Sequence, residues 1–158
     1  MLTYREATEH DLPAIIELAT DMVLHSVSPF RPVAAEQVRH YRREDLQSLP
    51  EILAMEQSGV FVALDQAKVV GHIIVVAHQK DSSTGTPQAW IYDVSVHPGY
   101  WGQGVGRHLL ELAEQFARQQ GMGAIGLGVT LANHRAHQFY LQQGYLEERV
   151  QMVKNFEP

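Results

Sequence analysis

Residues 94–107 of the chain read Val-Ser-Val-His-Pro-Gly-Tyr-Trp-Gly-Gln-Gly-Val-Gly-Arg. A short alternating apolar run stops at a proline, three glycines follow at every second position from Gly102, and an amphipathic helix pattern begins at once. Glycine has no Cβ and tolerates positive φ, so several backbone N–H groups can turn toward one point. Such a cluster of donors at the start of a helix binds phosphate oxygens. The stretch therefore predicts a strand, a phosphate-binding turn and a helix in succession.

The sequence on both sides of this turn alternates between strand and helix patterns. Strands are predicted at residues 2–7, 60–64, 69–76, 89–96, 124–129 and 145–156. Helices are predicted from a start at Thr8 and Asp11 to about His25, over 34–49 with a short piece at 50–55, from Val105 to about 120, and over 133–143. A strand–turn–helix–strand unit implies a right-handed crossover with parallel strands, and ligands bind where such strands end. The predicted fold class is α/β.

Length and composition limit the class of protein. The 158 residues suit one domain, residues 1–158, and a hydrophobic content of 45% is typical of globular proteins. The formal net charge of −6 argues against a nucleic-acid partner. There is no cysteine, which excludes thiol nucleophiles and disulfides. No apolar run reaches the ~18–20 residues of a membrane span, and the charged N-terminal residues are unlike a signal peptide. We therefore expect a cytoplasmic protein with no membrane partner.

Two common glycine motifs do not fit the turn. A dinucleotide fingerprint that starts at Gly102 needs a third glycine at position 107, which is arginine. A mononucleotide P-loop needs a Gly-Lys-Ser/Thr sequence, whereas Gly104 is followed by Val105 and Gly106. Neither motif explains the phosphate ligand that the turn predicts.

Two stretches instead resemble the GNAT acetyltransferase superfamily. Its signature Gln/Arg-x-x-Gly-x-Gly/Ala, between a strand and a helix, is matched in its last part by Gly104-Val105-Gly106 after Val96-His97-Pro98. The stretch Asn133-x-x-Ala136-x-x-Phe139-Tyr140-x-x-x-Gly144-Tyr145 resembles the asparagine-to-tyrosine helix of the same superfamily, and residues 4–11 resemble its first strand and helix. The resemblance implies a GNAT fold with a mixed, mostly antiparallel sheet of six to seven strands and about four flanking helices. Its central strands would splay after Val96 and admit acetyl-CoA.

The resemblance also implies how acetyl-CoA binds. The pyrophosphate would lie against the backbone of the glycine turn, where the helix dipole and the charge of Arg107 favour an anion. The pantetheine arm would lie along the preceding strand, and a backbone N–H of Val94 or Val96 would hold the thioester oxyanion. Asn133 is a cofactor contact by resemblance and a candidate helix N-cap by its position. The residues expected at the cofactor are Val94, Ser95, Val96, Gly102, Gln103, Gly104, Val105, Gly106, Arg107, Asn133 and Tyr140.

The same resemblance assigns Tyr140 as the general acid toward the CoA sulfur, with a core aromatic residue as the alternative. The general base stays open. Gly128 stands where some members of the superfamily carry a glutamate, and Asp93 is the leading substitute. A purely structural carboxylate at Asp93, a base at His97 or His72, and a base acting through water are the alternatives. Strict alternation assigns Asp93 to one strand face with Ile91 and Ser95, and the opposite face to Trp90, Tyr92, Val94 and Val96.

Two further features concern the polar groups of the site. Trp101 stands where the superfamily signature has glutamine or arginine, which removes one polar side chain beside the pyrophosphate. His134 and His137 are three residues apart on one predicted helix, but there is no third ligand at a fitting spacing and no cysteine. We therefore expect no metal site and assign both histidines to a solvated face.

The function that the resemblance implies is transfer of the acetyl group of acetyl-CoA to a primary amine by direct attack on the thioester. The alternative is a non-catalytic acyl-CoA-binding sensor or regulatory module. The acceptor is a small-molecule or protein amine, and the acidic net charge favours a cationic one. The loops at 26–32 and 80–87 are expected to shape its pocket. The resemblance leaves a homodimer open.

Overall fold

The computed structural model describes residues 1–158, and its centre is one five-stranded sheet in the order β1-β2-β3-β4-β5. The strands are β1 (Leu2–Glu6), β2 (Ser58–Asp65), β3 (Lys68–Lys80), β4 (Pro87–Val96) and β5 (Ile125–Gly126). The first four pair antiparallel, and β5 pairs parallel to β4. The predicted mixed, mostly antiparallel sheet is confirmed, and the number of strands is five rather than six to seven.

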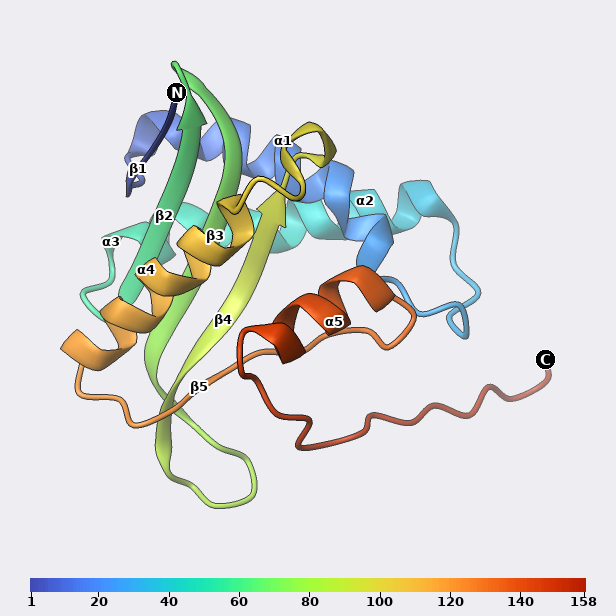
Figure 1. Cartoon of the computed structure of the whole chain (residues 1–158). Coiled ribbons are helices and arrows are strands. Elements are labelled where there is room, and N and C mark those ends of the chain that lie inside the picture. The colour runs from blue at the N-terminus through green and yellow to red at the C-terminus, as the bar shows by residue number, and fades with distance from the viewer.

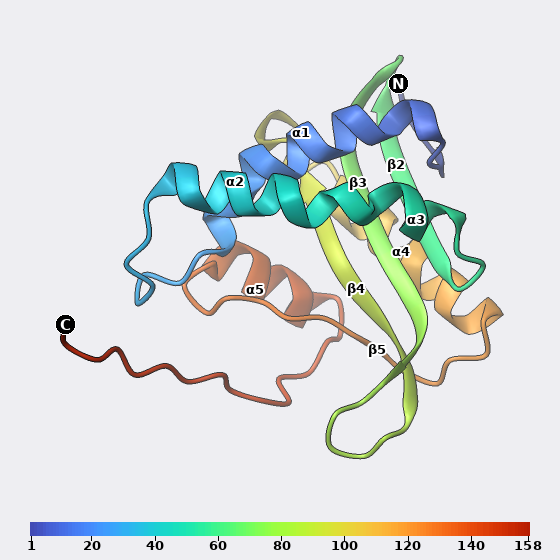
Figure 2. The ribbon, with the colours of Figure 1, turned by 180° about the vertical axis from the view of Figure 1, so that it is seen from behind.

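Helices cover both faces of this sheet. On one face lie α1 (Leu12–Met22), α2 (Ala35–Asp45) and the short α3 (Leu49–Ala54), and on the other lies α4 (Val105–Gln119) (Figures 1 and 2). The last helix, α5 (His134–Gln142), lies beside β4 and β5. The four longer helices match the predicted number of about four. None of the helices is both long and apolar enough to span a bilayer.

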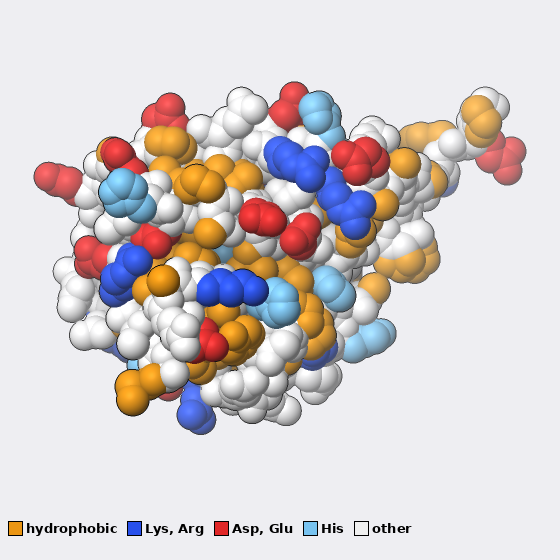
Figure 3. Space-filling model, turned by 90° about the horizontal axis from the view of Figure 1, so that it is seen from above, with side chains coloured by type: hydrophobic (Ala, Val, Ile, Leu, Met, Phe, Trp, Pro, Cys, Tyr) orange, Lys and Arg blue, Asp and Glu red, His pale blue; other side chains and the backbone are white.

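The C-terminal residues 145–158 form no strand, which corrects the prediction of a strand at 145–156. A strand needs a neighbouring edge, and β5 offers a two-residue ladder before the chain leaves the sheet. Side-chain contacts hold the segment elsewhere: His137 of α5 contacts Glu147 at 2.5 Å, and Arg149 pairs with Asp81 of the β3–β4 loop. Figure 3 shows the segment projecting from a surface where acidic, basic and hydrophobic side chains are interspersed.

Strand β4 contains one extra residue. Asp93 pairs with Ile74 and Ile91 pairs with Val75, so Tyr92 has no partner on β3 and forms a bulge. Ile91 faces α4, yet Asp93 faces the opposite side with Ile74. Strict alternation is therefore wrong across the bulge, because Val94 shares the face of Ile91 and not the face of Trp90.

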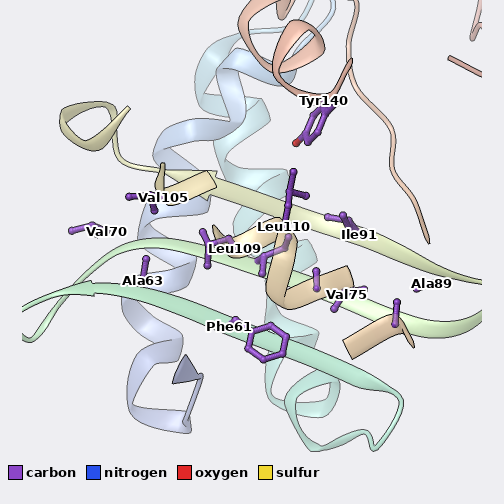
Figure 4. Packing of buried hydrophobic residues seen from close by; sticks show 13 residues of the cluster. Phe61, Ala63, Val70, Val75, Ala89, Ile91, Val105, Leu109, Leu110 and Tyr140 are labelled. Atoms are coloured by element: carbon purple, nitrogen blue, oxygen red, sulfur yellow. The ribbon is translucent and has the colours of Figure 1, made fainter. Parts of the chain in front are cut away.

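Two apolar clusters, one on each face, hold the layers together. The larger cluster packs α4 against β2, β3 and β4, and Figure 4 shows Leu109 and Leu110 of α4 over Val75 and Ile91. Both leucines are fully buried, and burial of one such side chain contributes roughly 2 kcal/mol. The smaller cluster joins α1 and α3 to β2. Because α4 is fixed on the sheet, the glycine turn that precedes it is held at the end of β4.

The predicted start of the first helix is confirmed. The Asp11 carboxylate accepts hydrogen bonds from the backbone N–H and hydroxyl of Thr8, at 2.7 and 3.0 Å, and pairs with both terminal nitrogens of Arg5. These bonds hold the pKa of Asp11 at about 2, below its ordinary value of 3.8, with the Arg5 hydrogen bond as the largest cause.

Candidate active site

Strands β4 and β5 separate shortly after they meet. They pair only at Ala89–Ile125 and Trp90–Gly126, and from residue 91 onward β4 has β3 on one side and no strand on the other (Figure 1). The splay between the central strands is thus confirmed, but it begins after Trp90 and not after Val96. It leaves the edge of β4 from Ile91 to Val96 open to a cleft between the sheet and α5.

The hydrogen-bond phase of β4 decides which backbone groups face this cleft. The His97 N–H donates to the carbonyl of Val70 on β3 at 2.8 Å. Because alternate residues of a strand direct their N–H groups to opposite sides, the N–H groups of Val94 and Val96 point to the open edge. Ser95 directs its N–H toward β3, and its side chain is buried. Two functions are predicted for this stretch, pairing with the pantetheine arm and an N–H donor for the thioester oxyanion. The N–H groups of Val94 and Val96 have the orientation that the second function needs.

The glycine turn presents further unpaired donors. Gly102 and Gly104 have φ angles of 74° and 82°, in the left-handed region that favours glycine. Gly106 is required for a different reason, since a Cβ there would lie 3.3 Å from the Phe139 ring of α5. The backbone N–H groups of residues 102–107 donate to no carbonyl of the chain, and the first intrahelical bond runs from His108 to Gly104. The turn therefore has the predicted cluster of free backbone N–H donors.

Trp101 joins this turn to β4 and α5. Its indole N–H donates to the Val96 carbonyl at 2.8 Å, and the guanidinium of Arg135 lies 3.5 Å from its ring centre. Burial lowers the pKa of Arg135, although a cation over an aromatic face is attracted to it. Arg135 is not among the site residues expected from the sequence, where its only signal is its place two residues after Asn133. Arg135 of α5 thus places a positive charge beside the glycine turn. The sequence had suggested that Trp101 removes a polar side chain from this place.

Tyr140 lies between α5 and β4, packed on Ile91 and Leu110 (Figure 4). Burial is the main reason that its pKa rises to about 12, with the negative charge of Asp93 adding to the effect and Arg135 opposing it. The phenol is therefore protonated at neutral pH. Asn133 caps the helix, because its side-chain oxygen accepts from the Ala136 N–H at 3.4 Å.

Asp93 lies within reach of Tyr140 and is held by two donors. His72 of β3 places its Nε2 2.5 Å from one carboxylate oxygen, and Arg42 of α2 places a guanidinium nitrogen 2.5 Å from the other. Burial alone would raise the pKa of Asp93, but the His72 hydrogen bond and the charge of Arg42 outweigh it and hold the pKa below its usual value. The carboxylate is therefore ionised at neutral pH.

His97, His134 and His137 differ in their contacts and in their exposure. His97 accepts a hydrogen bond from the Gly99 N–H at its Nδ1, in the exposed turn after β4. His137 is largely buried against Glu147, so it does not lie on a solvated face as expected, whereas His134 is exposed. No group of three or more potential metal ligands is present. A Cβ at Gly128 would meet nothing within 4 Å, so there is open space at the position where the resemblance expects a glutamate in some members of the superfamily.

The chain is similar in sequence to known proteins. Residues 20–145 match the model of the acetyltransferase (GNAT) family. A mycothiol acetyltransferase from Propionibacterium freudenreichii is 30% identical, over 85% of this chain and 55% of its own length. The chain spans about half the length of the curated relatives it matches first.

Solved structures give the same result for the fold. A Pyrococcus furiosus protein described as an acetyl transferase is 27% identical and has a TM-score of 0.81, over 99% of this chain and 100% of that one. AAC(6')-Iy, in complex with the bisubstrate analog CoA-S-monomethyl-acetylneamine, is 16% identical with a TM-score of 0.73, over 99% of both chains. The second likeness concerns the fold alone. Because the family model matches most of this chain, the chain belongs to the acetyltransferase (GNAT) family.

Proposed function

We propose that the protein is an N-acetyltransferase that transfers the acetyl group of acetyl-CoA to a primary amine. The observation that carries the proposal is two groups of free backbone donors, Val94 and Val96 on the open edge of β4 and residues 102–107 of the glycine turn. A thioester and a pyrophosphate joined by a flexible arm need donors at these two places. AAC(6')-Iy, a protein of the same fold, has been solved with a CoA conjugate.

The pyrophosphate binds at the glycine turn in this proposal. Backbone N–H groups and the start of α4, a helix of 15 residues, supply partial positive charge. Arg107 on the first turn of α4 and Arg135 over Trp101 add two formal charges nearby. Each charge-assisted hydrogen bond of this kind contributes about 1.5–3 kcal/mol when well formed, so the site needs no metal ion to hold the two phosphates.

Acetyl transfer then follows from the groups around the thioester. The neutral amine attacks the carbonyl carbon, and the oxygen that gains negative charge is held by the N–H of Val94 or Val96. The C–S bond breaks, the electron pair leaves with sulfur, and the Tyr140 hydroxyl donates a proton to it. The proton lost by the amine goes to Asp93, directly or through water. Tyr140 is restored by solvent, and the products are an amide and CoA with a free thiol.

The side chains that line the cleft indicate which kind of acceptor amine fits it. Residues of the segment 19–42 that line it include apolar and aromatic side chains together with Arg31 and Arg42, and none is acidic. Phe30 and Tyr41 are about two-thirds exposed there. We therefore propose an amine with an apolar or aromatic body. The net charge of the whole chain had favoured a cationic amine, such as a polyamine, an aminoglycoside or a lysine side chain, but this wall has no cluster of carboxylates that would bind several positive charges.

The proposal is tested by incubating the protein with acetyl-CoA and a panel of primary amines, and by measuring the release of CoA thiol and the acetylated product. Arylalkyl and alkyl amines are expected to turn over faster than polyamines and aminoglycosides. Calorimetry with acetyl-CoA alone provides the control for cofactor binding. Tight binding of acetyl-CoA without turnover of any amine would favour the non-catalytic acyl-CoA-binding module.

A further inference from the structure

His72 is a polar side chain in the centre of the sheet with no access to solvent. It is fully buried on β3, in register with Ser95, on the face covered by α1 and α2. Its Nε2 lies 2.5 Å from Asp93, and its Nδ1 is buried without any partner. Burial of an imidazole costs free energy unless both ring nitrogens make hydrogen bonds. The presence of a buried histidine with a single bond, to Asp93, therefore calls for an explanation.

The tautomer of His72 follows from these contacts. An ionised carboxylate can only accept, so the hydrogen of the His72–Asp93 bond belongs to Nε2. A proton on Nδ1 would leave a buried charged donor without an acceptor, which is more costly than a neutral ring. His72 is accordingly a neutral donor to Asp93, and because it is fully buried it cannot contact an amine in the cleft.

Arg42 holds the other oxygen of the same carboxylate. It comes from α2, its side chain is 16% exposed, and it also pairs with Asp45 at 2.8 Å. Asp93 is thereby fixed from two elements, with one donor on each oxygen. The bulge at Tyr92 turns the carboxylate toward both. The other ionisable groups near it are Tyr140 and, through Tyr140, Arg135, both from α5.

The two donors leave some acceptor positions of the Asp93 carboxylate free. Its two oxygens offer about four acceptor positions, and the Asp93 side chain remains 17% exposed at the cleft. The free positions can accept an N–H of the amine or a bridging water. The carboxylate cannot rotate to do so, because both oxygens are already held.

We propose that His72 and Arg42 are positioning residues that fix Asp93 in the orientation and ionisation state that amine deprotonation requires. This inference rests on the proposed acetyl transfer. His72 acts through its neutral Nε2–H, and Arg42 acts through its charge and its hydrogen bond. Without either donor Asp93 would bind its proton at higher pH and turn more freely, and the neutral amine would lose an ordered acceptor for its proton.

The test is the pH profile of kcat/KM for the fastest amine of the panel. Removal of a donor destabilises the ionised carboxylate, so His72→Leu, which has no donor, and Arg42→Gln, which loses the charge, are each expected to move the acid limb up by about one pH unit. Arg42→Lys keeps the charge and is expected to restore most of the shift. Arg43→Gln, which alters an exposed arginine of α2 paired with Glu36, is the matched control and is expected to leave the profile unchanged.

A uniform loss of rate at all pH values, with the acid limb in place in both variants, would overturn the inference. Arg42 lines the cleft and belongs to neither apolar cluster, so the Arg42 pair decides the matter if His72→Leu does not fold. A second measurement is independent of turnover. In spectra of the protein labelled with ¹⁵N at histidine, His72 is expected as the Nε2–H tautomer with a resonance that moves in Asp93→Asn. An Nδ1–H tautomer would contradict the arrangement even if amine acetylation is observed.

Discussion

The indole N–H of Trp101 lies 2.8 Å from the carbonyl oxygen of Val96, so a side chain of the glycine turn pairs with the last carbonyl of the open β4 edge. The guanidinium of Arg135 lies over the same ring, 3.5 Å from its centre. The tryptophan that departs from the family signature therefore makes two contacts, one with the strand and one with α5. The turn, the strand end and α5 are joined at a single residue beside the proposed pyrophosphate position.

Substitution of Trp101 separates these two contacts. Trp101→Phe keeps an aromatic face for Arg135 and loses the hydrogen bond to Val96, which is worth about 1 kcal/mol. The dissociation constant of acetyl-CoA is expected to rise about five-fold. Trp101→Ala loses the stacking as well, so its dissociation constant for acetyl-CoA is expected to be higher still. Calorimetry measures both constants, and equal values for the two variants would remove Arg135 from the cofactor site.

Tyr140→Phe tests the proposed acid. The variant keeps the ring that packs on Ile91 and Leu110 and loses only the proton donor. Turnover is expected to fall ten-fold or more, while the affinity for acetyl-CoA changes little. Tyr92→Phe, which loses a surface hydrogen bond to Gln79, is the matched control. If the Tyr140 variant turns over amines at the rate of the parent, another group protonates the sulfur.

Gly104→Ala tests the conformation of the turn. The φ angle at this position is 82°, and an added Cβ meets no atom closer than 3.9 Å, so the cost is conformational rather than steric. Alanine in this region costs about 1–2 kcal/mol. KM for acetyl-CoA is expected to rise roughly ten-fold, with kcat retained at saturation. Gly128→Ala, where φ is ordinary and the space is open, is expected to behave as the parent does. A similar KM in both variants would argue against the turn as the phosphate site.

The Asp11–Arg5 pair predicts a pH-dependent stability. The folded pKa of about 2 lies below the unfolded value of 3.8, so the pair stabilises the fold fully above pH 4 and loses this contribution as the pH falls toward 2. The shift corresponds to about 2 kcal/mol. Asp11→Asn is expected to be destabilised by about that amount at pH 7, with roughly half of the difference left at pH 3, and to approach the parent only below pH 2. Urea unfolding at several pH values measures the difference, and a gap that stays constant down to pH 3 would show that the charge of Asp11 is not its cause.

Local patterns predicted most of the elements because the residues that form them are close in sequence. The Thr8–Asp11 start, the β2–β3 hairpin and the glycine turn each depend on neighbours within a few positions. The outward N–H groups of Val94 and Val96 were also predictable, since a strand alternates. These features account for the fold class and the backbone part of the site.

Other features depend on contacts between distant residues and leave no local pattern. Arg42 and Asp93 are 51 positions apart and come from a helix and a strand whose docking sets their distance. The unpaired segment at 145–158 has the alternation of a strand, but the sheet offers it no edge. A bulge likewise has no signature in the apolar pattern, so the assignment of faces on β4 failed at Tyr92.

The bulge at Tyr92 also sets how β4 tolerates insertions and deletions. Its extra residue is the reason that Ile91 faces α4 while Asp93 faces His72. Loss of Tyr92 would give a regular ladder and leave both side chains on their present faces. Gain of one residue between 91 and 93 would have to enlarge the bulge or shift every residue beyond it along β3, and Asp93 would then lose its place opposite Ile74. In homologous chains we therefore expect this strand to vary in length by shortening and not by growth.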